Sequence, residues 1–195
     1  MSKLQLHKPF KWMNITQKWG VRNPAYDQFG FKNHNGIDLT SGYANQQGVY
    51  MPKKWPVWCP VENFTVHMVR NNSAGSGKDI WLISKEKLQM GDKLCYAYLG
   101  FAHADYIFLK PGDTPALGEM IMVADNTGFS TGPHTHIGLY RVEWDGKIMT
   151  FLDTNESNGS YDPALFFTDK FAVDLATLGT LMKSSWRYYQ YLMGL

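Results

Sequence analysis

Short strand-like segments separated by turn residues fill the first 160 residues, and they constrain the fold of this chain more than any other feature. The segments lie at 14–19, 36–40, 57–69, 79–84, 94–99, 119–124, 134–142 and 148–152. Turn-forming residues separate them, as at 71–77, 111–113 and 144–147. Strands at this spacing, without alternating helices, predict a mainly β fold with an antiparallel sheet or barrel-like core. Residues 57–69 are expected to hold a strand pair.

The C-terminal segment has a different periodicity. Its apolar residues recur near a helical period: Phe171, Leu175, Leu178, Leu181, Met182, Trp186 and Tyr189. This pattern predicts one or two helices over residues 169–191. We therefore expect a core domain over residues 1–165 and a C-terminal helical extension over residues 166–195 that packs on it. Docking of this extension to a protein partner is the alternative.

Length and charge exclude several classes of function. A chain of 195 residues suits one domain with a small appendage. Its net charge of 19 − 17 = +2 provides no basic stripe for a nucleic acid. The sequence contains no run of 18 apolar residues, so no membrane span is expected. Residues 1–20 lack the features of a secretion signal, and we expect another route to any site outside the cell.

The two cysteines, Cys59 and Cys95, lie in apolar, strand-like surroundings. They are not spaced as a Cys-x-x-Cys metal or redox motif. Two buried free thiols are expected, with a single disulfide as the alternative.

Two histidine-containing fragments carry the chemistry. In the first, His34 and Asp38 flank Gly36, whose freedom to bend would let both side chains reach one ion. In the second, His134 and His136 are two apart on an expected strand, so both imidazoles face the same way. Two adjacent imidazoles are costly to bury without partners. One as a metal ligand and the other as a catalytic group explains the pair better.

This set of side chains favours zinc. Two imidazoles and a carboxylate, together with a water, are the usual ligands of a catalytic zinc ion. Such a zinc lowers the pKa of its water towards about 7 and polarises a carbonyl group. Calcium and magnesium prefer all-oxygen sites. Iron held by two histidines and a carboxylate is the chemical competitor.

The two fragments resemble the signature motifs of a known family. Residues 34–38 (His-Asn-Gly-Ile-Asp) and 128–136 (Gly-Phe-Ser-Thr-Gly-Pro-His-Thr-His) are similar to those of the lysostaphin-type zinc metalloendopeptidases, which hydrolyse peptidoglycan peptides. The resemblance also includes residues 15–20, the 111–113 turn and Gly118, and it spans residues 14–140. Residues 161–163 are a weaker match at the family's common end. It implies the β-rich peptidase core of that family, Zn²⁺ as cofactor and the peptide of bacterial peptidoglycan as substrate.

The resemblance also implies a role for each site residue. His34, Asp38 and His136 match the metal ligands, and His134 matches a catalytic histidine. A further catalytic histidine usually follows a Tyr-Ala pair, nine residues before a Gly-Asp turn. Counting back from that turn here leads to His103, in Phe-Ala-His.

The sequence departs from the family pattern at several positions that are not ligands. Ile137 and Gly138 stand where an aromatic residue and a glutamate usually follow the histidine pair, and Thr135 replaces a leucine. We expect altered packing and substrate fit rather than loss of metal. His7 and His67 belong to no such motif and are expected to be surface or packing residues.

The resemblance predicts an endopeptidase that cuts peptide cross-links of the wall, acting there as a phage lysin or virion-associated lytic enzyme. One alternative is a catalytically silent module that binds peptidoglycan or activates another hydrolase. A structural component of a phage particle is a second alternative. The bond that is cut, a glycyl bridge or a D-alanyl cross-link, is not fixed by the motifs.

Overall fold

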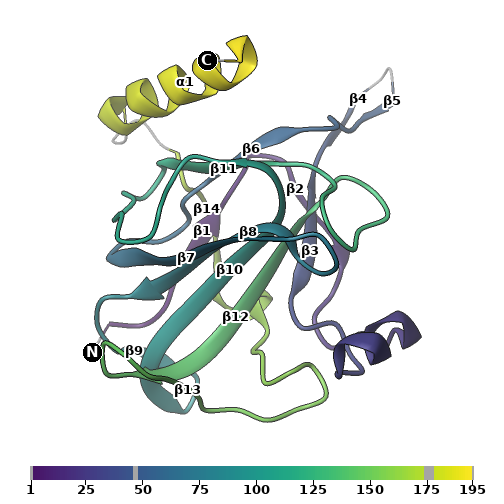
Figure 1. Cartoon of the computed structure of the whole chain (residues 1–195). Helices are drawn as coiled ribbons and strands as arrows, with labels where there is room; N and C mark the ends of the chain where they lie inside the picture. The colour runs from purple at the N-terminus through teal and green to yellow at the C-terminus, as the bar shows by residue number, and fades with distance from the viewer. Residues whose placement is uncertain (1, 46–47, 174–177, 195) are drawn as a thin grey trace.

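A single antiparallel sheet of ten strands makes up most of the protein, as the spacing of the strand segments predicted (Figure 1). The computed structural model describes residues 2–45, 48–173 and 178–194. The sheet contains β2 (Met13–Gln17), β3 (Ile37–Ser41), β6 (Trp55–Trp58), β7 (Phe64–Asn72), β8 (Gly77–Ser84), β9 (Leu88–Met90), β10 (Lys93–Ile107), β11 (Met120–Ala124), β12 (Thr135–Trp144) and β13 (Met149–Phe151). Its main path runs β2–β3–β12–β10–β11–β6, and β7 joins through β8 at the side of β10.

Strand β10 organises this sheet. Over its middle it pairs with β12 on one side and with β8 on the other, and its last residues pair with β11. The change of partner coincides with a break in the register around His103, whose φ is +63°. This is the left-handed region, which few residues other than glycine adopt. The break places His103 at the point where β10 turns from one partner to the next.

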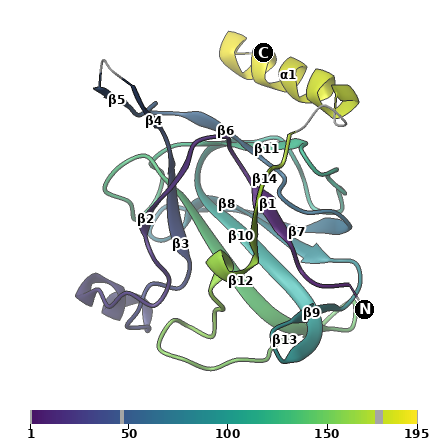
Figure 2. The same ribbon diagram turned by 180° about the vertical axis from the view of Figure 1, so that it is seen from behind.

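The two faces of the sheet differ, as the period of a strand requires. Leu82 of β8, Leu99 and Phe101 of β10, and Leu139 of β12 point into the fully buried hydrophobic core. The alternate residues on these strands point to the opposite face. The core is closed from behind by β1 (Leu6–Lys8) and β14 (Phe167–Phe171), which pair in parallel across the back of the sheet (Figure 2).

Two 3₁₀ helices and a hairpin complete the fold around the sheet. Helix η1 (Pro24–Phe29) begins after Asn23, whose side-chain oxygen accepts a hydrogen bond from the Ala25 amide at 3.0 Å. Helix η2 (Pro163–Phe166) begins after Asp162 in the same way, with a bond of 2.9 Å to the Ala164 amide. The hairpin of β4 (Tyr43–Asn45) and β5 (Gly48–Tyr50) projects from the body (Figure 1).

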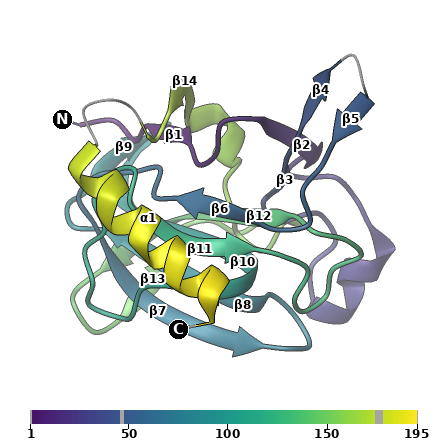
Figure 3. The same cartoon turned by 90° about the horizontal axis from the view of Figure 1, so that it is seen from above.

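The predicted C-terminal helical segment, residues 169–191, is a helix only in part, and its residues 174–177 lie outside the described part of the chain. Helix α1 (Leu178–Met193) is present, but residues 169–171 belong to β14 instead of a helix, because pairing with β1 satisfies their backbone groups. The helix lies over β11 (Figure 3). Arg187 forms an ion pair with Glu119, and the Tyr191 hydroxyl donates to Oδ2 of Asp105 at 2.5 Å.

Two further sequence expectations have clear outcomes. Residues 57–69 do not form a strand pair: β6 pairs with β11 and β7 pairs with β8, so the two strands there are not partners. Cys59 and Cys95 are both buried and free, as expected.

Among the residues described, no helix has the length and apolar character needed to cross a bilayer.

Candidate metal centre

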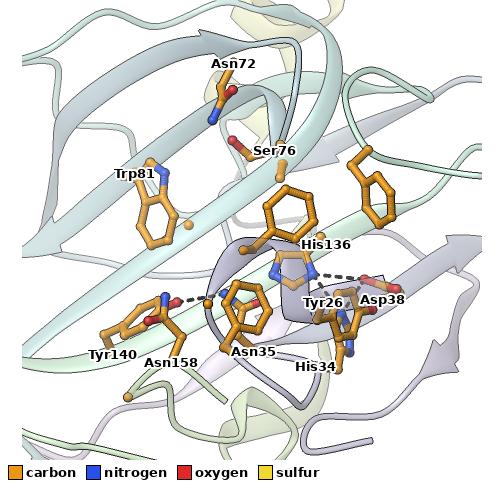
Figure 4. Close-up of a pocket in the computed structure, with 18 of the residues that line it drawn as sticks. Tyr26, His34, Asn35, Asp38, Asn72, Ser76, Trp81, His136, Tyr140 and Asn158 are labelled. Carbon is orange, nitrogen blue, oxygen red and sulfur yellow. Dashed lines mark hydrogen bonds and ion pairs between the residues drawn. The ribbon is translucent and has the colours of Figure 1, made fainter. Parts of the chain in front are cut away.

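The sheet brings together the three side chains that were predicted as metal ligands. His136 on β12 is the register partner of Asp38 on β3, and His34 lies in the loop that leads into β3. Nδ1 of His136 lies 3.0 Å from Oδ1 of Asp38 and 3.0 Å from Nε2 of His34. Nε2 of His34 is 3.1 Å from the same carboxylate oxygen. Figure 4 shows the three side chains converging from β3, β12 and the loop before β3.

The geometry and chemistry of this cluster fit zinc. Tetrahedral zinc with bonds of 2.0–2.1 Å would hold its ligand atoms about 3.3 Å apart. The three observed separations, 3.0 to 3.1 Å, are close to that value. Nδ1 of His34 lies 3.1 Å from the carbonyl oxygen of Lys18, so it carries the proton and leaves Nε2 free for a ligand bond.

The ionisation of the cluster also suits a cation. Burial alone would raise the pKa of the Asp38 carboxyl, but hydrogen bonds with His136 and His34 outweigh it and hold that pKa well below its usual range. Burial lowers the pKa of His136, against the opposing effect of Asp38. The cluster therefore presents a carboxylate and a neutral imidazole, which are the forms that bind metal.

Gly36 supplies space rather than a bend. A Cβ atom at this position would lie 2.7 Å from Cε1 and Nε2 of His136, and closer still to the carbonyl oxygen of Ile137. Its φ lies outside the left-handed region, so the flexibility expected from the sequence is not what the site uses. Glycine is needed here because β12 and its histidine approach the backbone closely.

His103 and His134 lie side by side next to the three-residue cluster. Their ring centroids are 4.4 Å apart, and His103 is 6.2 Å from His136. Nδ1 of His103 donates to the carbonyl oxygen of Thr127 at 2.7 Å, and Nδ1 of His134 donates to that of Gly132 at 2.9 Å. Nε2 of His134 is 3.5 Å from Oδ1 of Asp38. All five residues expected from the sequence are thus in one place.

His103 is held in its neutral form. Burial is the main cause that lowers its pKa to about 4, with further contributions from His134 and His136. With Nδ1–H committed to Thr127, the other ring nitrogen, Nε2, can accept a proton.

The cluster opens into a large cleft of about 1150 Å³ that is rich in aromatic side chains. Tyr26 stacks on His34 at one end, with ring centroids 5.7 Å apart and an interplanar angle of 17°. Trp81 and Tyr140 line the other end (Figure 4). A cleft of this size and composition can hold an extended peptide or a similar chain.

Sequence reasoning missed several residues that shape this site. Tyr26 comes from η1, and Thr127 comes from the loop before β12; neither belongs to a recognisable spacing. Asn35, whose amide donates to the Tyr140 hydroxyl at 3.1 Å, joins the loop before β3 to the far part of the cleft. His67, expected to be a surface or packing residue, packs edge-on against Tyr98 and Trp144 at the margin of the cleft. His7 lies in β1, away from the cleft.

Comparison with known proteins shows which solved structures have a fold similar to that of this chain. No family model matches the sequence. A protein of Haemophilus influenzae called an uncharacterized metalloprotease is 29% identical over 119 residues, which cover 61% of this chain and 20% of that protein. The catalytic domain of lysostaphin from Staphylococcus simulans, an antimicrobial peptidase, superposes with a TM-score of 0.52 at 20% identity, covering 78% of this chain and 90% of the other.

A zinc-containing peptidase from Vibrio cholerae gives a TM-score of 0.52 at 22% identity over 71% of this chain and 37% of its own. This chain therefore spans about a fifth of the Haemophilus protein and about two fifths of the Vibrio chain that it resembles. The alignment with lysostaphin, in contrast, covers nearly the whole of a single catalytic domain. The chain has the lysostaphin-type peptidase fold, as the resemblance of its motifs predicted.

Proposed function

We propose that this protein is a zinc-dependent endopeptidase that hydrolyses peptide cross-links of bacterial peptidoglycan. One observation carries the proposal: Asp38 and two histidines, His34 and His136, converge within 3.0 to 3.1 Å at an open cleft. The names of the similar proteins, a metalloprotease, an antimicrobial peptidase and a zinc-containing peptidase, are consistent with this reading.

The residues divide into a metal-holding set and a proton-handling set. His34, Asp38 and His136 would hold the ion through Nε2, Oδ1 and Nδ1. When bound, zinc supplies Lewis acidity to a peptide carbonyl and makes a nearby water more acidic. A scissile peptide lying in the cleft would cross this point, where His103 and His134 are close by.

His103 and His134 then handle the protons of hydrolysis. Water adds to the carbonyl carbon, the C–N bond breaks, and one proton passes from the water to the leaving amine. His103, neutral and held by Thr127, is suited to accept that proton at Nε2. His134 lies beside it; because its Nδ1–H is committed to Gly132, its Nε2 can take up the proton in turn and then donate a hydrogen bond to the oxygen that gains negative charge.

We further propose that residues 1–165 are the catalytic domain and that residues 166–195 are an extension attached to it. The ion pair of Arg187 with Glu119 and the hydrogen bond of Tyr191 with Asp105 support this attachment. Trp186 and Tyr189 of the helix are exposed and stacked on each other, and they could contact a protein partner. The cell wall is the proposed place of action, reached as a phage lysin or as part of a virion.

Zinc content and wall hydrolysis test the proposal together. The purified protein should contain one zinc per chain, and purified peptidoglycan should yield new amino and carboxyl ends that mass spectrometry can locate. A chelator should abolish release, and added zinc should restore it. A protein that binds peptidoglycan and zinc without releasing new ends would instead be the silent binding module. A protein that neither binds zinc nor cuts the wall would refute the proposal.

A further inference from the structure

The cleft continues well beyond the metal centre, across β10 and β8 to the edge strand β7. Its floor there is formed by Trp81, whose ring lies flat over Gly100: a Cβ on this glycine would be 2.6 Å from three carbons of the indole. Gly138 adjoins the same ring, at 3.6 Å for an added Cβ. Two glycines paired across β10 and β12 thus make room for one aromatic platform.

Arg70 stands at the end of this platform in a fixed position. Its Nε and Nη2 donate to the two carboxylate oxygens of Asp79 at 3.0 and 2.7 Å. Asp79 is fully buried and also accepts a hydrogen bond from the Ser76 hydroxyl. The guanidinium carbon lies over the Trp81 ring, 5.7 Å from its centroid. A buried carboxylate and an aromatic face therefore hold one side of the guanidinium still.

The other side of the guanidinium is available to a ligand. The Arg70 side chain is 47% exposed and lines the cleft. Within the part of the chain that the structure describes, its Nη1 has no hydrogen-bond partner. Among the described residues that line the cleft, Lys32 is the other lysine or arginine, and it is already paired with Glu156 at 2.8 Å. Arg70 is thus a cation that is held in place in the cleft and still has N–H groups on Nη1 that can bind a ligand.

The sheet register places Arg70 relative to the metal centre. Ala102 on β10 is paired with His136, and Asp79 lies near the same level of β8, next to Ile80, the partner of Phe101. Arg70 is the register partner of Asp79 on β7. Three strand spacings separate β12 from β7, which is about 14 Å across the sheet. An extended peptide covers this distance in about four residues.

We propose that Arg70 binds a carboxylate of the substrate peptide, within about four residues of the bond that is cut, and thereby determines which wall peptides the protein accepts. This inference rests on the proposed function, because it names the chemical group that the same cleft recognises. A guanidinium with planar, preset donors is suited to a carboxylate, and the partly apolar surroundings strengthen the bond. Trp81 would support the apolar part of the peptide beside it.

Paired substrates test the inference. Cross-linked disaccharide–peptide dimers can be prepared in forms that differ only in carrying a carboxylate or a carboxamide on the stem peptide. The wild-type protein should cleave the carboxylate form with about ten- to hundredfold higher kcat/KM. A third dimer, amidated only at its C-terminus, distinguishes a terminal carboxylate from one on a side chain. Equal kcat/KM for all three dimers would overturn the inference while leaving the proposed function intact.

Two variants separate recognition from folding. Arg70→Gln removes the cation but leaves Asp79 buried without its partner, so the fold could suffer. The double variant Arg70→Gln/Asp79→Asn removes both charges and keeps hydrogen-bonding groups at both positions. In this variant the preference for the carboxylate should vanish, because kcat/KM for the carboxylate dimer falls towards that for the carboxamide dimer. Retained preference, or an equal loss on both dimers, would contradict a recognition role.

Measuring the binding of the dimers without cleavage tests the role of Arg70 independently of the proposed peptidase activity. Calorimetry with the His134→Ala protein compares the affinities of the carboxylate and carboxamide dimers directly. Tighter binding of the carboxylate form that disappears on adding Arg70→Gln/Asp79→Asn supports the inference even if no dimer is cleaved. Absence of cleavage by the zinc-loaded wild-type protein would refute only the peptidase. Equal affinity for both dimers would refute the role of Arg70.

Discussion

Asp38 and His136 face each other across two antiparallel strands, with Oδ1 of the one 3.0 Å from Nδ1 of the other. The backbone hydrogen bonds of β3 and β12, rather than the freedom of two side chains, fix this separation. His34 reaches the same carboxylate oxygen from the loop before β3. A change that shifts either strand should therefore weaken metal binding as much as the loss of a ligand does.

Replacing His134, just before β12, and His136 within β12 should have different effects. His136→Ala removes a donor atom from the cluster, so the protein should lose its zinc and the thermal stabilisation that zinc provides. His134→Ala should keep its zinc, because its Nδ1 is bonded to Gly132 rather than to the cluster, yet turnover should fall by about 10² to 10⁴. Elemental analysis and peptidoglycan release measure the two properties. Equal zinc loss in both proteins would contradict this division of roles.

Gly36→Ala should disable the metal centre without removing any ligand. The added methyl group would collide with the His136 ring and with the carbonyl oxygen of Ile137, so β12 must move away from β3. Zinc affinity should drop by at least tenfold, with the circular dichroism of the sheet unchanged. Gly132→Ala is the matched control, because a Cβ there has nothing within 4 Å and its φ is not left-handed. Wild-type zinc affinity in Gly36→Ala would show that the close approach does not matter.

Replacing His103 by alanine should lower the stability of the protein more than replacing it by asparagine does. Both replacements should lower its turnover equally. Its φ of +63° is tolerated better by asparagine than by alanine. His103→Asn should stay close to wild-type stability, and His103→Ala should lose about 1 kcal/mol more. Both should keep zinc and lose turnover by at least about 10². Denaturant unfolding and turnover assays measure these effects. Full activity of either variant would exclude His103 from the proton transfer.

Arg141 and Asp153 should make the fold sensitive to acid. The Arg141 side chain is almost fully buried and binds Asp153 through Nε and Nη2 at 2.7 and 2.5 Å. Hydrogen bonding from Arg141 lowers the pKa of Asp153, against the effect of burial. The stabilisation is therefore complete above the ordinary aspartate pKa of about 3.9, and it is lost as the pH falls through the lower pKa of the folded state.

Asp153→Asn should destabilise the protein by about 3 kcal/mol at pH 7, because Arg141 loses a buried partner. The difference from wild type should shrink as the pH is lowered from 5 towards 2. Asp27→Asn is the control: its ion pair with Arg22 is exposed, and its loss should cost about 0.5 kcal/mol. Urea unfolding across this pH range provides the comparison. A difference that does not change with pH would contradict the assignment.

Much of the centre could be predicted because its signals are local in the sequence. The two-residue spacing of His134 and His136 predicts that both lie on one face of a strand. His103 was found through the resemblance to the family, by counting back from the turn at 111–113. The sequence did not reveal that His103 has a positive φ, because a break in register depends on which strands pair. Gly36 was recognised as important, but its physical reason, contact with β12, arises only from the fold.

The far part of the cleft could not be predicted for the same reason. Trp81 lies on Gly100 and beside Gly138, residues of three different strands, and Arg70 is held by Asp79 of the neighbouring strand. None of these pairings has a characteristic spacing. The prediction of helix from residue 169 failed at residues 169–171, because β14 finds a strand partner near the N-terminus, in β1. Helical periodicity is weak evidence when a segment can instead complete a β ladder.

The pairing of β3 with β12 has a consequence for the order of events during synthesis. Asp38 and His136 are 98 residues apart, so the chain must close a long loop before the two side chains meet. Contacts of this kind form late and slow the folding of β proteins. While the chain leaves the ribosome, His34 and Asp38 exist for a long time without their third partner. Tight zinc uptake, and with it any ability to cut peptides, should begin only when the central sheet is complete.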